Sequence, residues 1–259
     1  MSDFGQKARR LERIRLTLRR RYGEAPKVMV AHPVEHTLRT ILSEEATTSQ
    51  VEQAMNRLRE QFADWNDLRV SRPREIREAL GPDFPHAAEK ARVIPPLLDQ
   101  VFKRHNSMVW DFLEDLGKVA VRSYFEALQE VRPFVAATIA RDCAGAHAFP
   151  VDRDVARVLE RLSILEPQKQ SEREMQAMLE RAVKHSRAYE AHWLLKRLAE
   201  DLCLVEARVC SQCPLRKMCL SVEQAPRARA RRAKGAAKPS KRKSVAKRKR
   251  SSRKSKRNR

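Results

Sequence analysis

The sequence predicts an all-α protein, and three observations support this. Apolar residues recur at intervals of three and four positions along residues 1–223, which is the period of an amphipathic helix. Glycine and tyrosine are scarce, with 6 and 3 residues in a chain of 259. Runs of alternating apolar and polar residues, typical of strands, are missing. A chain of this length buries a substantial core, in one large domain or two small ones.

The expected helices follow from this period and from their end signals. Gly23 ends the first helix, Thr48 or Ser49 opens the third, and Pro133 stands where a first helical residue belongs. Pro95 and Pro96 are expected to break a helix that then continues to Phe102. The expected helices cover 11–22, 36–42, 48–62, 74–80, 87–94 with its continuation, 109–116, 119–128, 134–143, 155–162, 175–183 and 189–202.

The positive charge is concentrated at the C-terminal end. Residues 224–259 contain 18 Lys and Arg and no Asp or Glu, so they account for most of the formal net charge of +22. The segment also lacks Leu, Ile, Phe, Trp and Tyr, and we expect it to be disordered. Such a polycation binds polyanions by counterion release, and nucleic acid is the expected partner. A solubilising tail and a membrane anchor are the alternatives, but no amphipathic helix or acylation signal accompanies the charges.

Four cysteines lie together just before this tail, in the spacing C-x6-C-x2-C-x5-C: Cys203, Cys210, Cys213 and Cys219. Four thiolates with unequal spacing suit a [4Fe–4S] cluster, whereas structural zinc sites usually show two close pairs. Disulfides rank last, because residues 1–30 carry no apolar segment of a secretory signal. No stretch approaches the run of about 20 apolar residues that crosses a bilayer.

The order of several segments resembles one family, the endonuclease III-like helix–hairpin–helix DNA glycosylases. The segment from Leu38 to Thr47 resembles the family's LLSAQAT segment, and Phe149 to Asp152 resembles its VDTH segment. His192 and Trp193 then precede the cysteine run as they do in the family. The resemblance covers roughly residues 10–221 and implies a two-lobed helical fold, a [4Fe–4S] cluster on the four cysteines, and double-stranded DNA as the partner.

The hairpin departs from the family pattern. The family reads L-P-G-V-G-x-K-T-A, whereas this chain has Leu-Gln-Glu-Val-Arg-Pro-Phe-Val-Ala over residues 128–136. Both glycines are lost, Glu130 adds a carboxylate where a DNA phosphate would lie, and Arg132 is a candidate phosphate contact. The lysine nucleophile falls on Phe134, which cannot form a Schiff base, so no lyase chemistry is expected through that position. Lys118 is the nearest lysine along the chain.

Asp152 matches the family's catalytic carboxylate. By resemblance it would stabilise the positively charged sugar as the base departs, as relatives without the lysine do with water. An N-cap for the helix that begins near Val155 is the equally weighted alternative. Glu45 matches a glutamine that enters the gap left by a flipped base. It is a candidate acid or base, although a solvated pair with Glu44 is favoured. Arg208 is the basic residue of the loop between the first two cysteines.

The resemblance implies a domain plan. Residues 1–35 and 144–202 form one lobe, 36–143 a central barrel with the degenerate hairpin, 203–221 the cluster loop and 224–259 the tail. The tail's candidate DNA contacts are Lys241, Arg242, Lys243, Lys247, Arg248, Lys249 and Arg250. We expect a monomeric, cytoplasmic, nucleoid-associated protein of base-excision repair. Whether it is an enzyme is open at this point: an N-glycosylase using Asp152, a catalytically inactive DNA-binding relative, and a basic nucleoid- or RNA-associated protein all remain.

Overall fold

The computed structural model describes residues 3–27 and 30–222, and this part of the chain is helical without strands. The predicted all-α class is therefore confirmed. The helices are α1 Asp3–Tyr22, α2 Pro33–Leu42, α3 Thr48–Gln61, α4 Trp65–Val70, α5 Pro73–Leu80, α6 Ala87–His105, α7 Phe112–Asp115, α8 Lys118–Glu126, α9 Pro133–Ala144, α10 Arg153–Arg161, α11 Glu172–Ala182 and α12 His185–Asp201, followed by 3-10 turns at Arg216–Met218 and Leu220–Val222. In the described residues, no helix is both long and apolar enough to cross a membrane.

Helix starts agree with the local signals. Thr47 caps α3 in a capping box with Gln50, one residue before the predicted start. Pro133 is the first residue of α9, as predicted. Asp64 caps α4 by accepting a hydrogen bond from the backbone N–H of Asp67 at 2.8 Å. The prediction missed α4, although this cap is a readable signal.

The predicted break at Pro95 and Pro96 is wrong. Both prolines lie inside α6, which runs without interruption from Ala87 to His105. Each proline lacks the N–H that would bond the preceding turn, and this ordinarily costs several kcal/mol. Here Ile94, Pro95, Leu97 and Leu98 are buried in the core, so tertiary packing outweighs the local penalty. The predicted helix at 109–116 is likewise shorter than expected, because only Phe112–Asp115 is helical.

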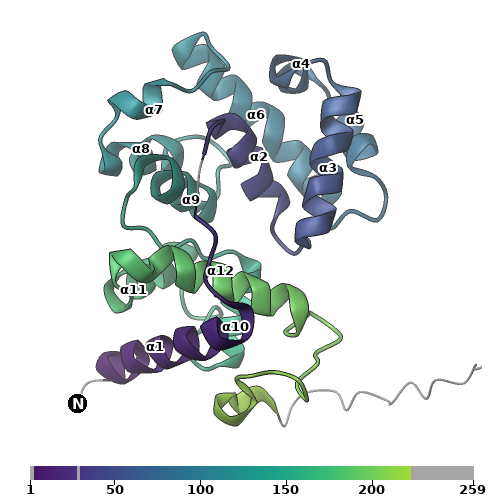
Figure 1. Cartoon of the computed structure of the whole chain (residues 1–259). Coiled ribbons are helices and arrows are strands. Elements are labelled where there is room, and N and C mark those ends of the chain that lie inside the picture. The colour runs from purple at the N-terminus through teal and green to yellow at the C-terminus, as the bar shows by residue number, and fades with distance from the viewer. Residues whose placement is uncertain (1–2, 28–29, 223–259) are drawn as a thin grey trace, which may run out of the picture. The chain divides into compact units, whose positions relative to one another are not determined.

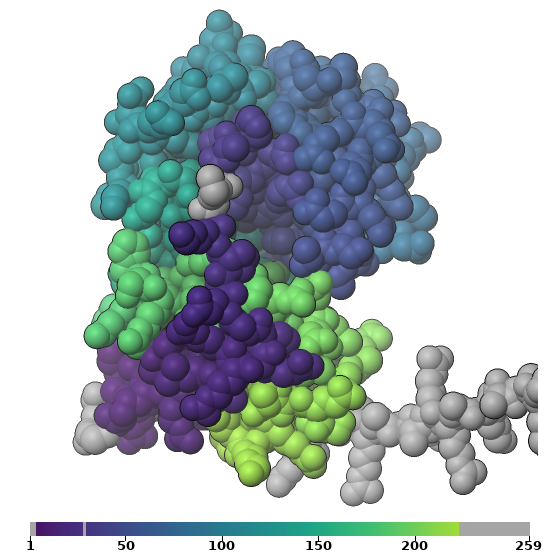
Figure 2. All heavy atoms as spheres, viewed as in Figure 1, coloured from purple at the N-terminus to yellow at the C-terminus, as the bar shows by residue number. Residues whose placement is uncertain are grey.

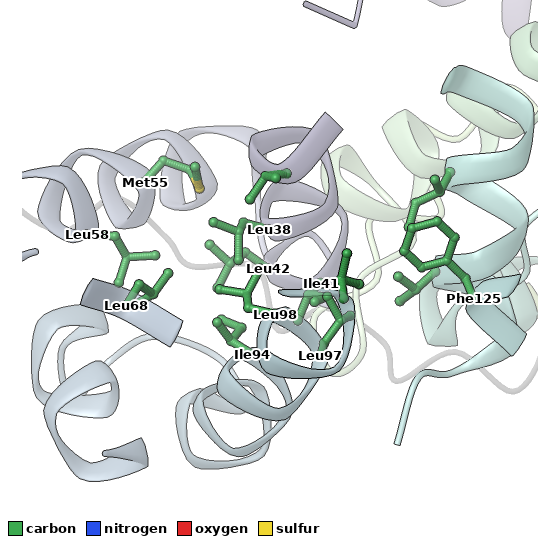
Figure 3. Close-up of a cluster of buried hydrophobic side chains, with 14 of the residues drawn as sticks. Leu38, Ile41, Leu42, Met55, Leu58, Leu68, Ile94, Leu97, Leu98 and Phe125 are labelled. Atoms are coloured by element: carbon green, nitrogen blue, oxygen red, sulfur yellow. The ribbon is translucent and has the colours of Figure 1, made fainter. Parts of the chain in front are cut away.

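The buried apolar side chains form two clusters. The first contains residues from 34 to 146 on α2 to α9, and Figure 3 shows its centre, where Leu38 and Leu42 lie near Met55 and Leu98. The second combines α1 with residues 149–215. Figure 1 shows α2 to α9 grouped together, and α1, α10, α11 and α12 grouped apart from them. Figure 2 shows α1 lying along the later helices, and the pairs α1–α12 and α1–α11 are in contact.

Two lysines hold the end of α2 to the rest of the molecule. Lys90 of α6 is 4% exposed and donates to the carbonyl oxygens of Leu42 and Glu44 at 3.0 and 2.7 Å. Lys196 of α12 donates to the carbonyl oxygen of Ser43 between them, at 3.0 Å. Carbonyls at a helix C-terminus lack intrahelical partners, so these ammonium groups satisfy them. The chain from Ser43 to Ala46 is thereby held in one place.

Lys90 makes the stability of the fold depend on pH. Burial lowers its pKa to about 8 from the ordinary 10.5, against the opposing effect of Glu44. Between these values the unfolded chain binds a proton that the folded chain does not, so the free energy of unfolding should rise with pH, by up to about 3 kcal/mol. Urea unfolding at pH 7.5 to 10 (roughly the titration window) measures this. Lys90→Met serves as the comparison, and parallel pH profiles for the two proteins would contradict the assignment.

Candidate active site and cysteine cluster

A cavity of about 380 Å³ lies where α2, α3, α9, α10 and α12 meet. Its walls include Glu45, Phe134, Asp152, Asp154 and Lys196. The structure therefore brings the predicted residues Asp152 and Glu45 to one cavity, together with the residue at the family's lysine position. The apolar part of the wall includes Phe134 and the side chains of Ala46, Val51, Tyr189 and Trp193.

Asp152 is both an N-cap and a wall residue of this cavity. Its Oδ1 accepts a hydrogen bond from the backbone N–H of Val155 at 2.9 Å and so caps α10. Its Oδ2 accepts from Lys196 Nζ at 2.5 Å. The residue is 3% exposed. The capping role that the sequence offered as an alternative is therefore present, and it leaves the carboxylate beside the cavity.

Lys196 is the residue that sequence reasoning missed. Its Nζ donates to Oδ2 of Asp152 and to Oδ2 of Asp154, both at 2.5 Å, and to the Ser43 carbonyl oxygen. Burial alone would lower the pKa of Lys196, but the two carboxylates raise it above its ordinary value. The only sequence signal is a lysine that follows the apolar pair Leu194 and Leu195 in α12, and nothing in the spacing connects it to Asp152.

The predicted solvated pair of Glu44 and Glu45 is wrong. Glu44 is 4% exposed, and both of its oxygens accept hydrogen bonds from Nη1 of Arg132 at 2.5 Å. Glu45 has a left-handed backbone with φ of +53°, and its N–H donates to Asp154 Oδ2 at 2.9 Å. Its carboxylate contacts His86 Nε2 at 2.6 Å. Partner side chains from distant segments therefore bury Glu44 and hold Glu45, whose side chain stays 18% exposed.

The hairpin turn has a left-handed backbone conformation although the glycine of the family pattern is absent. Glu130 takes the place of the family's first glycine and has φ of +63°. A non-glycine residue in this region costs roughly 1–2 kcal/mol. Its carboxylate binds Arg92 Nη1 at 2.7 Å. The predicted phosphate contact Arg132 is engaged within the protein, because its Nη2 binds Glu172 at 3.1 Å in addition to the Glu44 contact of Nη1.

The four cysteines line a second, smaller cavity together with Arg161, Arg208 and Arg216. None of the four forms a disulfide. Arg161 holds the loop at its start, since its guanidinium donates to the carbonyl oxygens of Cys203, Leu204 and Val205 at 3.1, 2.7 and 3.0 Å. The loop is thus fastened to the last turn of α10.

Four cysteine and three arginine side chains share the lining of this cavity. Burial, with the other three cysteines adding to it, raises the pKa of Cys213 to about 11. Four adjacent thiolates therefore need a strongly cationic partner. Nε of Arg208, the predicted DNA contact, is buried without a hydrogen-bond partner at the same cavity. In the described part of the chain, no group of three or more His, Cys, Asp or Glu is placed to hold a metal ion.

The predicted tail contacts lie outside the described residues. They are Lys241, Arg242, Lys243, Lys247, Arg248, Lys249 and Arg250.

Comparisons with known proteins identify the fold. No protein-family model matches the chain, and no curated protein matches it by sequence. Among solved structures, an endonuclease III trapped as a covalent intermediate with DNA matches with a TM-score of 0.65 and 19% identity, over 84% of this chain and 97% of that one. A thermostable thymine-DNA glycosylase matches with a TM-score of 0.56 and 14% identity, over 85% and 98% of the two chains.

A third similar structure is the 3-methyladenine DNA glycosylase of H. pylori bound to 1,N6-ethenoadenine, with a TM-score of 0.56 and 15% identity, over 75% of this chain and 97% of that one. The three similar proteins are thus DNA glycosylases or endonucleases, and each is covered almost completely. The chain has the helix–hairpin–helix DNA glycosylase fold, in the form seen in endonuclease III.

Proposed function

We propose that this protein binds damaged double-stranded DNA and acts as a DNA N-glycosylase of base-excision repair. The observation that carries the proposal is Asp152, whose carboxylate lies at the N-terminus of α10 in the wall of a cavity that also contains Glu45 and Phe134. The fold supports a DNA partner, because similar structures are endonuclease III in covalent and non-covalent complexes with DNA. A monomer associated with the nucleoid is the corresponding cellular state.

The chemistry follows from the charge that develops when a glycosidic bond breaks. The departing base leaves a sugar with oxocarbenium character, and a fixed carboxylate stabilises that cation. Asp152 supplies the negative charge, and the α10 N-cap holds its orientation. Glu45 lines the same cavity and is the candidate acid or base toward the flipped base. Phe134 at the hairpin supplies apolar surface and no nucleophile.

Asp152→Asn should reduce base release by about 100-fold or more, because it removes the charge that faces the developing cation. Asparagine is also a good N-cap and Asp154 still pairs with Lys196, so the fold should survive, as thermal unfolding checks. Base release is measured by chromatography over a panel of damaged duplexes. Asp83→Asn removes an exposed carboxylate far along the chain and serves as the control. Equal rates for the Asp152 variant and the parent protein would exclude the proposed role.

We also propose that Cys203, Cys210, Cys213 and Cys219 hold a [4Fe–4S] cluster. When bound, the cluster would link four points of the C-terminal loop by iron–thiolate bonds and act as a structural staple with redox capacity. Arg161 and Arg208 at this cavity would balance part of its negative charge. The cluster would join the end of α12 to the loop that follows it, on the side of the second core.

Purified protein should be brown and contain about four irons and four sulfides per chain. Cys213→Ser should lose most of the iron and unfold at a lower temperature. The chain offers a matched control in Cys143→Ser, since Cys143 does not line this cavity and its loss should leave the iron content unchanged. About one zinc per chain and no sulfide would contradict the cluster and indicate a tetrahedral zinc site instead.

A catalytically inactive DNA-binding relative is the second candidate, and one observation favours it. Both oxygens of Asp152 are already engaged, one by the α10 N-terminus and the other by Lys196. In that case damaged duplexes would be bound without base release. A nucleoid- or RNA-associated role would rest on the basic segment 224–259 alone.

Deleting residues 224–259 separates specific binding from binding by charge. The truncated protein should bind DNA with a much flatter dependence on salt, because the 18 removed cations release counterions on binding. Preference for a damaged over an undamaged duplex should survive the deletion. Binding titrations at several salt concentrations measure both quantities. If binding and damage preference both disappear, the helical body does not recognise damage.

A further inference from the structure

One lysine amine lies in the wall of the cavity that contains Asp152. Phe134 and Asp152 line this cavity with Lys196, which enters it from α12. We propose that Lys196 is the amine of a Schiff-base lyase acting on abasic DNA, supplied by α12 because α9 carries Phe134 at the usual position. The inference rests on the proposed function only in that the abasic strand must enter this cavity.

The side chain of Lys196 is more exposed than those of the two carboxylates that it contacts. The Lys196 side chain is 19% exposed, whereas the side chains of Asp152 and Asp154 are 3% and 8% exposed. More of the Lys196 side chain than of either carboxylate is therefore open to a sugar that enters the cavity. Asp152 and Asp154 hold the amine in place with two contacts of 2.5 Å.

The proposed lyase role also needs residue 196 to be a lysine. The other basic residues that line the cavity are Arg39, Arg141, Arg157 and Arg197, with His36 and His192. Arginine pairs with carboxylates at least as well as lysine does, but it cannot form an imine. A purely structural partner for Asp152 and Asp154 would not need to be a lysine. Lys90, the other buried lysine nearby, points its amine at backbone carbonyls and does not line the cavity.

The reaction balances with groups that the protein and the substrate hold. The carboxylates keep the amine protonated at rest, so the attack begins when one ammonium proton passes to Asp152 or Asp154. The free amine adds to the C1′ aldehyde of the ring-opened abasic sugar, and the adduct loses water to give an iminium. Loss of a C2′ proton to a carboxylate expels the 3′-phosphate with its bonding electrons. Hydrolysis of the imine then returns Lys196.

The test uses the full-length protein, a duplex with one preformed abasic site, and sodium borohydride. Hydride adds to the iminium carbon and converts a transient imine into a stable amine, and peptide mass spectrometry then locates the modified lysine. We expect one covalent adduct, on Lys196. Preformed abasic DNA makes the result independent of base release, and binding of the same duplex is measured in parallel.

Two variants sharpen the result. Lys196→Arg keeps a cation between Asp152 and Asp154 and should fold, as checked by circular dichroism and thermal unfolding, yet the adduct should be lost. Lys118→Gln removes an exposed lysine at the start of α8 and should leave the adduct unchanged. If Lys196→Arg does not fold, the mapped adduct of the unmodified protein decides the question by itself.

The outcomes separate this inference from the proposed glycosylase. An adduct on Lys196 without base release would support the lyase and count against the glycosylase. Base release without an adduct would support the glycosylase and overturn the lyase. An adduct on another lysine, including those of segment 224–259, overturns the lyase role of Lys196. Failure to bind the abasic duplex overturns both proposals.

Discussion

The buried ammonium of Lys196 is the contact on which the arrangement of the cavity depends. It meets the Ser43 carbonyl after α2, the N-cap Asp152 of α10, and Asp154 in the first turn of that helix. Ser43 follows a helix of the first core, whereas α10 and α12 belong to the second. One side chain therefore joins the two cores at the cavity. Removing the ammonium would leave the buried carboxylate of Asp152 without its cation, which typically costs several kcal/mol.

The hairpin lacks the glycines of the family pattern, and its arginine is paired with carboxylates of the protein. The backbone of Glu130 still has a positive φ, so the turn keeps its shape although glycine is gone. Arg132, just before α9, is held by Glu44 and Glu172. A phosphate that approached Arg132 would compete with two carboxylates for the same guanidinium. The carboxylates and the amine of the cavity therefore indicate a function more directly than the hairpin does.

Side chains of α10 connect the cysteine loop to the cavity that contains Asp152. Arg157 of α10 pairs with Asp154 at 2.8 Å and also donates to the Cys203 carbonyl oxygen at 3.1 Å. Arg161, one turn later, holds the carbonyl oxygens that follow. The helix that presents Asp152 at its start thus anchors the cysteine loop at its end. A ligand that orders this loop would therefore also restrain α10.

The sequence by itself determined the helical class, most helix positions, the four-cysteine loop and the resemblance of Asp152 to a catalytic carboxylate, because periodicity, caps and spacing are local properties. It failed where packing overrides local preference, as at Pro95 and Pro96 inside α6. It also could not find Lys196 or the burial of Glu44, since the partners of these charges lie 42 to 153 residues away along the chain. Only the tertiary structure decides which charged side chains share a buried space, and the low polarity of that space makes their pairing strong enough to define the site.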